Sequence, residues 1–258
     1  MRPDVPPQAT NSGEAGLAEW EATLHSQNGE DGILRGIFSQ IGFTNRTFVE
    51  FGFGYRENNA LRLILKEGFR GTYIDGNSKT VRMMQAALAQ RRIPQVNAIC
   101  KMLTRENVNQ VVSKAAPEQS LDLLSIDVDG IDYWLWQALD SVDARVVVIE
   151  YNASFGPSRS ITVPYDPAFD RTTKHPSWAY FGASLTALSK LAKRRNYALI
   201  GCGSEGVNAF FVRRDCLHGI PEQTPATAYR PRKVLVEGGR SVEAQWLEIK
   251  EMPYIDVA

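Results

Sequence analysis

Short runs of branched and aromatic residues alternate along this chain with segments in which hydrophobic residues recur every three or four positions. Runs of strand length cover residues 47–51, 71–75, 95–100, 121–127, 145–150, 197–202 and 207–212. Helical spacing covers residues 32–38, 59–68, 81–90, 105–114, 133–136 and 183–195. The runs at 121–127 and 145–150 are hydrophobic almost throughout, which is typical of strands buried on both faces. The pattern therefore predicts an open, mostly parallel α/β sheet with helices on both faces.

The last two predicted strands are separated by Gly203-Ser-Glu-Gly206. A connection of four residues with two glycines is typical of a hairpin, so we expect the last strand to be antiparallel. Together the runs predict a seven-stranded sheet in a three-layer sandwich.

Three segments fall outside this pattern. Residues 1–20 are rich in Pro, Gly, Ser and Asn and contain no apolar run, which predicts a flexible leader and not a secretory signal. The main domain is expected over residues 21–216. Within it, residues 151–182 begin with a long stretch rich in Pro, Ser, Asp and Thr, which favours a substrate lid. Residues 217–258 form a C-terminal extension whose structure the pattern does not indicate.

The composition narrows the class of protein. The 258 residues include 29 basic and 29 acidic side chains, and this balance argues against nucleic acid or an anionic membrane as partner. No run approaches the ~20 apolar residues of a membrane helix. The three cysteines are too few and too dispersed for a disulfide scaffold and suit a reducing cytoplasm. We therefore expect a cytoplasmic protein, and the sequence leaves a homo-oligomer open.

A glycine turn, Gly52-Phe-Gly54, follows the first predicted strand and precedes a predicted helix. Glycines at such a turn let a ligand approach the backbone and the free N–H groups of the helix. Asp75 ends the next strand, where a carboxylate can accept both hydroxyls of a ribose. An ordinary tight turn with a capping aspartate would give the same pattern. The third glycine of the dinucleotide fingerprint is missing, and Glu50 and Glu57 suit a cationic sulfonium cofactor better than a pyrophosphate.

Further motifs extend this observation over most of the chain. They are Ser26-Gln-Asn-Gly-Glu-Asp31, Phe48-Val-Glu-Phe-Gly-Phe-Gly54, Glu57-Asn-Asn59, Gly71-Thr-Tyr-Ile-Asp75, Leu123-Leu-Ser-Ile-Asp-Val-Asp-Gly130 and Gly206-Val-Asn-Ala-Phe-Phe211. With these motifs, residues 24–215 resemble the class I S-adenosylmethionine (SAM)-dependent methyltransferases of the FkbM-like branch. The resemblance implies a Rossmann-like fold and SAM as the cofactor.

The resemblance also implies roles for particular residues. Gly52 and Gly54 would contact the methionine part of SAM, and Glu50 would face its amino group, directly or through water. Asp75 would hold the ribose. Gln27 and Asn59 would support the cofactor pocket. For Gln27, a helix N-terminal signal is an equal alternative, because Ser and Asn before Glu-Asp commonly begin a helix.

A second candidate site lies at the ends of two central strands, in Asp127-Val-Asp129 and Glu150-Tyr-Asn152. Ligands of open α/β sheets bind beyond the carboxyl ends of the strands, so these side chains should border the transferred methyl group. Asp129 and Asn152 are therefore candidate substrate-binding residues. Asp127, Glu150 and Asn152 would also suit a shared Mg²⁺, although the resemblance does not require a metal. Capping of the next helix explains Asp129 and Asp132 equally well.

Methyl transfer to a hydroxyl benefits from a general base that accepts the proton. The candidate catalytic residues are Asp127, Glu150 and His175, of which His175 lies in the expected lid. A single loop histidine is also typical of an ordinary surface position. Tyr180 and its aromatic neighbour Trp178 would suit a sugar ring beside carboxylates, or would simply anchor the lid on the core.

The sequence thus predicts a methyltransferase that transfers a methyl group from SAM to an oxygen of a small-molecule or sugar-containing acceptor. Three alternatives stay open. The chain could use SAM for N-methylation or cyclisation, could be a nicotinamide-dependent oxidoreductase, or could be a non-catalytic binding module of the same fold.

Overall fold

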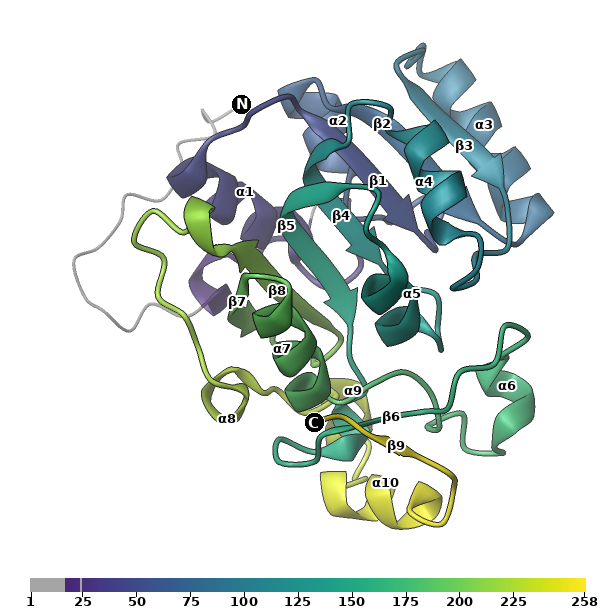
Figure 1. Ribbon diagram of the computed structural model, residues 1–258, viewed down its shortest axis with the longest axis vertical. Coiled ribbons are helices and arrows are strands. Elements are labelled where there is room, and N and C mark those ends of the chain that lie inside the picture. The colour runs from purple at the N-terminus through teal and green to yellow at the C-terminus, as the bar shows by residue number, and fades with distance from the viewer. Residues whose placement is uncertain (1–16, 24) are drawn as a thin grey trace.

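The computed structural model describes residues 17–23 and 25–258, with a seven-stranded sheet at its centre (Figure 1). The strands are β1 (Thr47–Phe51), β2 (Arg70–Asp75), β3 (Val96–Cys100), β4 (Ser120–Ile126), β5 (Asp143–Glu150), β7 (Tyr197–Cys202) and β8 (Asn208–Arg213). Their order across the sheet is β3-β2-β1-β4-β5-β8-β7. β8 pairs antiparallel with β5 and β7, and the other pairs are parallel. The predicted sheet, with its antiparallel last strand, is confirmed.

Helices cover both faces of the sheet. One layer contains α1 (Glu30–Ile41), α2 (Leu61–Glu67) and α3 (Ser78–Gln90), and the other contains α4 (Val108–Ala115), α5 (Asp132–Ala138) and α7 (Leu185–Arg194). Successive side chains of a strand point to opposite faces, so Phe48 of β1 packs in the first layer and Val49 in the second. The Rossmann-like three-layer sandwich is therefore confirmed.

The central strands explain the uninterrupted hydrophobic runs. All of β4 after Ser120 and all of β5 after Asp143 are buried, because helices cover both of their faces. Their one buried ion pair joins Asp122 to Arg145 at 3.0 Å, near the amino ends of the two strands. The carboxyl ends of β4 and β5 are thus left for other chemistry.

The expected flexible leader, residues 1–20, lies mostly outside the described residues, but its end differs from the expectation. Residues 17–20 form a 3₁₀-helix, η1 (Leu17–Trp20), and Leu17 is buried. A side chain at Gly36 would come within 2.2 Å of the Trp20 ring, and one at Gly201 within 2.8 Å of Leu17. The two apolar side chains therefore fill grooves that glycines leave open, which is why this part of the segment is ordered.

The insertion (residues 151–182) and the C-terminal extension (residues 217–258) pack against each other at the lower end of Figure 1. The insertion contains η2 (Ala153–Phe155), β6 (Ile161–Thr162) and α6 (Arg171–Lys174). After η3 (Arg214–Cys216), the extension contains α8 (Pro225–Ala228), α9 (Lys233–Glu237), α10 (Val242–Ile249) and β9 (Ile255–Asp256). β6 pairs antiparallel with β9, and Phe155, Tyr180 and Ile249 share a hydrophobic cluster.

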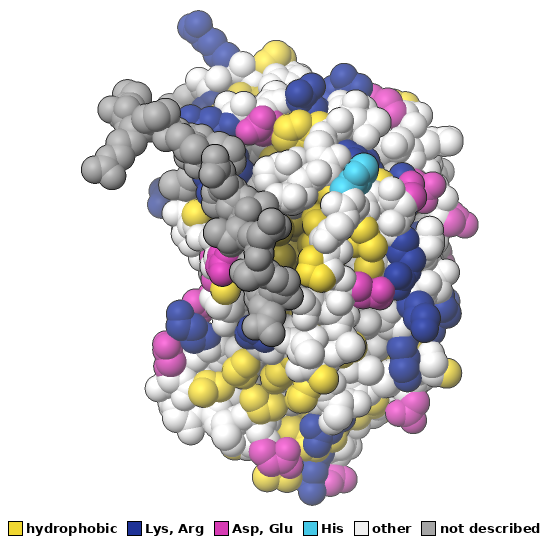
Figure 2. Space-filling view, turned by 90° about the vertical axis from the view of Figure 1, so that its left-hand side faces the viewer, with side chains coloured by type: hydrophobic (Ala, Val, Ile, Leu, Met, Phe, Trp, Pro, Cys, Tyr) yellow, Lys and Arg dark blue, Asp and Glu magenta, His cyan; other side chains and the backbone are white. Residues whose placement is uncertain are grey.

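The surface carries charges of both signs. Figure 2 shows basic and acidic side chains interspersed over one face, in keeping with the equal totals of the sequence. Among the described helices, none combines the length and the apolar character needed to cross a bilayer.

Candidate functional site

A cavity of about 560 Å³ lies beyond the carboxyl ends of β1, β2 and β4. Gly52, Gly54, Asp75, Asp127 and Asp129 all line it. Parallel strands end at the same edge of the sheet, and the order of strands changes direction between β1 and β4. This is the position at which open α/β sheets bind ligands.

Gly52 is required by the backbone geometry of the first turn. Its φ is +63°, and an added Cβ would lie 1.6 Å from the backbone oxygen of Asp127. An added Cβ at Gly54 would lie 2.6 Å from the backbone oxygen of Glu57. Gly52 therefore lets the loops after β1 and β4 come into contact, and Gly54 lets the loop after β1 fold closely on itself, both without a side chain between the backbones.

Asp75 lies at the end of β2 and is half-buried in the cavity wall. Its Oδ1 accepts a hydrogen bond of 2.6 Å from the backbone N–H of Asn77, which begins α3. Burial raises the pKa of Asp75, although backbone donors from Asn77 and Phe53 oppose that effect. Asn77, and not Asp75, caps α3, since its side chain accepts from Lys79 and Thr80.

Glu50 has a different environment from the one that the resemblance implies. It is 2% exposed, and its two oxygens accept from the backbone N–H groups of Asn59 and Ala60, at 3.0 and 2.9 Å. Burial raises its pKa from 4.5 to about 8. Both oxygens are thus used at the start of α2, and Glu50 does not line the cavity.

Asn59 and Gln27 also lie away from the cavity lining. The Asn59 side chain donates to Ser125 Oγ at 3.0 Å, and so ties the start of α2 to β4. Gln27 is exposed, next to a reciprocal pair in which Ser26 Oγ accepts from the Asp31 N–H and Asp31 accepts from the Ser26 N–H. This arrangement favours the helix-terminal interpretation of the Ser26–Asp31 motif. Contacts of Gln27, Glu50 and Asn59 with a cofactor stay predictions.

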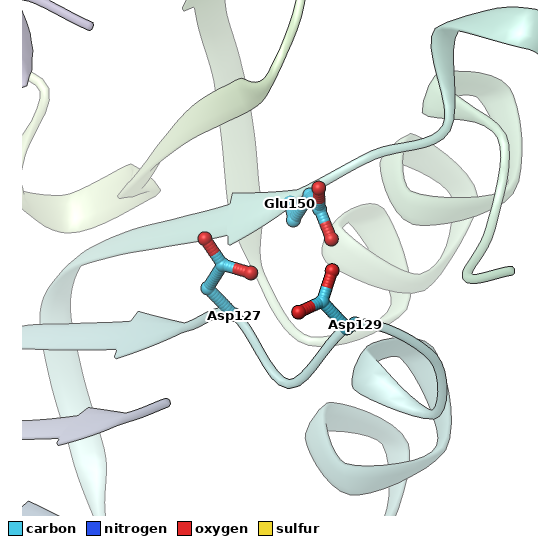
Figure 3. Close-up of side chains that lie close together, drawn as sticks. All are labelled: Asp127, Asp129 and Glu150. Atoms are coloured by element: carbon cyan, nitrogen blue, oxygen red, sulfur yellow. The ribbon is translucent and has the colours of Figure 1, made fainter. Parts of the chain in front are cut away.

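Three carboxylates meet at the edge of the cavity. Asp127, Asp129 and Glu150 each offer an oxygen within 4.8 Å of the others, and Figure 3 shows the three side chains pointing toward one another. Burial raises the pKa of Asp127 and of Glu150 well above their ordinary values, and the neighbouring carboxylates add to both shifts. Glu150 Oε2 is buried and has no hydrogen-bond partner in the described chain.

The insertion places a guanidinium beside these acids. Arg171 of α6 donates to Asp129 and lies 4.0 Å from Glu150 Oε1. Its Nε and Nη2 donate to the Trp178 carbonyl at 3.1 and 3.0 Å, and its Cζ lies 3.7 Å from the centre of the Phe181 ring. Sequence reasoning missed Arg171, because only the fold brings α6 next to the strand ends.

Asp132 shapes the loop that carries Asp127 and Asp129. Its two oxygens accept from the N–H groups of Val128 and Gly130 at 2.8 and 2.9 Å. Burial raises its pKa from 3.8 to about 6. The capping alternative therefore describes Asp132, whereas Asp129 is exposed, has a φ of +58° and pairs with Arg171.

A metal ion at this site would find a donor set different from the predicted one. The Asn152 side chain donates to the carbonyls of Ala179 and Phe181 at 2.7 and 2.9 Å and accepts from Ser154, so its polar atoms are used. Asp129 takes its place beside Asp127 and Glu150. A metal stays a prediction, and Arg171 already supplies positive charge there.

A second cavity, of about 220 Å³, lies on the other side of the carboxylates. Glu150, Asn152 and Arg171 line it, together with residues of the extension. Asp127 and Asp129 line the first cavity and Glu150 lines the second, and their oxygens lie within 4.8 Å. The three carboxylates therefore lie between the two cavities.

His175 and Tyr180 line neither of these two cavities. His175 Nδ1 lies 2.8 Å from Ser177 Oγ and accepts from the Ser177 N–H at 3.2 Å. Tyr180 is 2% exposed and its hydroxyl donates to the Pro253 carbonyl at 2.5 Å. Tyr180 thus anchors the insertion to the extension. A catalytic His175 stays a prediction without a contact to the carboxylates in the described chain.

Comparisons with known proteins gave structural similarity only. No family model and no curated protein matches the chain. It is similar to a solved N-terminal domain of EvdMO1 with SAH bound, at 10% identity and a TM-score of 0.43 over 71% of this chain and 79% of that one. It is also similar to magnesium protoporphyrin IX methyltransferase from Synechocystis PCC 6803 with bound SAM (12%, TM-score 0.45, 71% and 77%) and a putative caffeoyl-CoA O-methyltransferase from Staphylococcus aureus (14%, TM-score 0.41, 65% and 75%).

Similarities of this size do not assign an activity to the chain. The FkbM-like branch also stays a prediction. The features that bear on its activity are its own two cavities and the carboxylates between them.

Proposed function

We propose that this protein is a SAM-dependent methyltransferase that methylates an oxygen of a small-molecule or sugar-containing acceptor. The observation that carries the proposal is Glu150 Oε2. This oxygen is buried and has no hydrogen-bond partner in the described chain, and its residue lines the second cavity and lies next to Asp127 and Asp129 of the first. An acceptor hydroxyl in the second cavity would supply the missing donor.

The first cavity fits a sulfonium nucleoside. Gly52 and Gly54 leave the backbone of the first turn without side chains, which gives room for the methionine part. Asp75 offers a half-buried carboxylate at the end of β2, the position for ribose hydroxyls. Bound there, SAM would supply an electrophilic methyl group on a positively charged sulfur.

The chain's own residues would then act by alignment and proton transfer. The meeting point of the cavities fixes the direction of approach, and alignment supplies much of the rate in a displacement reaction. Glu150 would accept the hydroxyl proton on Oε2. A raised pKa makes the ionised Glu150 a stronger base than an exposed glutamate, and the positive charge of Arg171 opposes part of that rise in pKa. Arg171 would hold Asp129 in place and offset part of the negative charge beside Glu150.

An oxygen acceptor is favoured because the cavities meet at carboxylates. A hydroxyl must lose a proton during transfer, and a buried carboxylate is the group that takes it. The second cavity, at about 220 Å³, is smaller than the ~300–1,000 Å³ of typical ligand pockets. It would hold a small acceptor or one group of a larger one. We propose neither a nucleic acid nor a membrane as a partner.

Titration calorimetry with SAM and with S-adenosylhomocysteine tests the proposal. We expect one site per chain, and we expect Asp75→Ala to weaken SAM binding by about tenfold or more, equal to roughly 1.4 kcal/mol. Asp140→Ala is the control, since Asp140 is an exposed aspartate outside the cavity lining, just before β5. Absence of heat with both ligands at about 1 mM would contradict the proposal.

Mass spectrometry of products separates the remaining outcomes. SAM incubated with candidate hydroxylated acceptors should give a product heavier by one methylene unit, with the methyl on oxygen. Methyl on nitrogen, or a cyclised fragment from SAM alone, would leave the cofactor assignment intact and overturn the acceptor.

A further inference from the structure

The C-terminal extension forms one wall of the second cavity. The sequence alone did not assign the extension to any site. Arg232 and Arg240 line the cavity from the extension, and Arg171 lines it from the insertion. Trp178 and Phe181 add aromatic surface on the insertion side. Three arginines thus line a small cavity, and among its described lining residues Glu150 is the one acidic residue.

The three arginines differ in how their charge is used. Arg171 pairs with Asp129, and Arg240 Nη2 binds Glu248 Oε2 at 2.5 Å. In the described part of the chain, no ion pair or side-chain hydrogen bond includes Arg232. A half-buried guanidinium without a partner in a concave site is an available donor for an anion.

The backbone that carries Arg232 is held from both sides. The Tyr151 hydroxyl donates to the Arg230 carbonyl at 2.5 Å, and the Lys233 N–H donates to the Glu205 carbonyl at 3.1 Å. A side chain at Gly206 would come within 2.7 Å of the Arg232 nitrogen, so the glycine allows the hairpin turn to contact the extension directly. Arg232 is therefore presented from a fixed position, which lowers the entropy cost of binding.

We infer that the second cavity binds the acceptor through an oxyanion, a carboxylate or a phosphate, held by Arg232, while the acceptor hydroxyl faces Glu150. The inference rests on the proposed function, since it names the class of acceptor for the same site. The aromatic and aliphatic lining, with Trp178 and Leu235, suits an apolar ring or chain next to the charged group. The acceptor is thus a hydroxylated organic acid or a phosphorylated hydroxy compound.

Three probes of similar shape test the charge preference: benzoate, phenyl phosphate and benzyl alcohol. Binding to the full chain is measured by ligand-observed NMR titration, with and without S-adenosylhomocysteine. We expect at least one oxyanion to bind about tenfold more tightly than benzyl alcohol, because a charge-assisted hydrogen bond in a partly buried site is stronger than a neutral one. The two oxyanion arms distinguish a carboxylate acceptor from a phosphate acceptor.

Variants then locate the binding to Arg232. Arg232→Gln should weaken the preferred oxyanion about tenfold and leave benzyl alcohol unchanged, and Arg232→Lys should recover part of the loss. Lys233→Gln is the matched control, since Lys233 is exposed, pairs with Glu205 and lies outside the cavity lining. The fold should tolerate both changes, because the Arg232 side chain has no partner in the described part of the chain and the Lys233–Glu205 pair is at the surface, and circular dichroism checks this.

The inference is overturned if benzyl alcohol binds as tightly as the oxyanions, if no probe binds, or if Lys233→Gln and Arg232→Gln have equal effects. Its failure differs from a failure of the proposed function. If the protein bound an oxyanion through Arg232 but did not bind SAM, the oxyanion site would stand and the proposed methyltransferase activity would be wrong. If the protein bound SAM but showed no preference for an oxyanion, the proposed function would stand and the oxyanion site would be wrong.

Discussion

Glu150 lies between two environments, and its chemistry follows from both. It ends a strand that is buried on both faces, so water does not solvate its carboxylate. Asp127, Asp129 and Asp132 add negative charge from the β4–α5 loop, and Arg171 adds positive charge from α6. Desolvation is the largest of these effects, and it raises the pKa of Glu150. The side chain therefore gains or loses its charge depending on what binds next to it.

This coupling predicts a pH dependence of cofactor preference. Raising the pH ionises Glu150 and Asp127, whose pKa values are raised, and negative charge favours cationic SAM over S-adenosylhomocysteine, which lacks the sulfonium charge. The ratio of SAM affinity to S-adenosylhomocysteine affinity should therefore rise severalfold as the pH is raised from slightly acidic to alkaline values. Calorimetry across this range measures it.

The variant Glu150→Gln should reduce that rise, since it removes one titrating charge while keeping the shape. Asp140→Asn, on an exposed aspartate just before β5, should leave the rise unchanged. Because the same two ligands are used with every variant, the titration of their amino groups cancels when the rise in Glu150→Gln is compared with that of the unaltered protein. A ratio that does not change with pH would show that the carboxylates do not face the sulfur.

At the scale of elements, the sequence predicted what local periodicity determines. The strand at residues 145–150 was predicted correctly, because a strand that is buried on both faces requires a continuous run of hydrophobic residues. The start of α4 was placed too early, at Arg105, because the Asn107 side chain holds a turn with Thr104 before the helix begins at Val108. Helix α10 and its contacts could not be predicted, since its packing partner lies some 90 residues earlier, as the Ser154–Gln245 bond shows.

Gln245 links the extension to the insertion and gives an element-scale prediction. It is 0% exposed, its Oε1 accepts from Ser154 Oγ at 2.9 Å and its Nε2 donates to the Arg240 carbonyl at 2.8 Å. Gln245→Ala would leave both partners buried without bonds, so we expect a loss of about 1–3 kcal/mol in unfolding free energy. Urea denaturation measures this.

Glu243→Ala in the same helix is the matched control, because the Glu243 side chain is 66% exposed. For Glu243→Ala we expect the free energy of unfolding to change by no more than about 0.5 kcal/mol. If Gln245→Ala were equally mild, the extension would not be firmly attached to the insertion, and the second cavity would lack a stable wall.

At the scale of the whole molecule, the site is assembled from segments that are far apart in the chain. The first cavity could be predicted in part, because Gly52 and Asp75 lie in a strand–turn–helix pattern that local sequence reveals. The second cavity could not, because Arg171 and Arg232 carry no local signal and acquire a role only through tertiary packing. The contact of Glu50 with the cofactor stays a prediction, and tertiary packing shows that both its oxygens accept from the backbone at the start of α2.

Gly206 connects these distant parts, and its replacement tests whether the molecule works as one unit. Its φ is +69°, and an added Cβ would lie 2.2 Å from the Pro231 carbonyl oxygen, so Gly206→Ala must displace either the β7–β8 turn or the extension. Gly239→Ala is the control for backbone strain alone, since Gly239 has a φ of +83° and open space around it.

Both variants should lose about 1–2 kcal/mol of stability from the left-handed backbone. Gly206→Ala should lose more, and it should also weaken the preferred oxyanion while SAM affinity stays unchanged, because Arg232 moves and the first cavity does not. Thermal denaturation, probe titration and SAM calorimetry on the two variants measure this difference. Equal behaviour of the two would mean that the turn does not position Arg232, whereas loss of SAM binding in Gly206→Ala alone would mean that the two cavities are not independent.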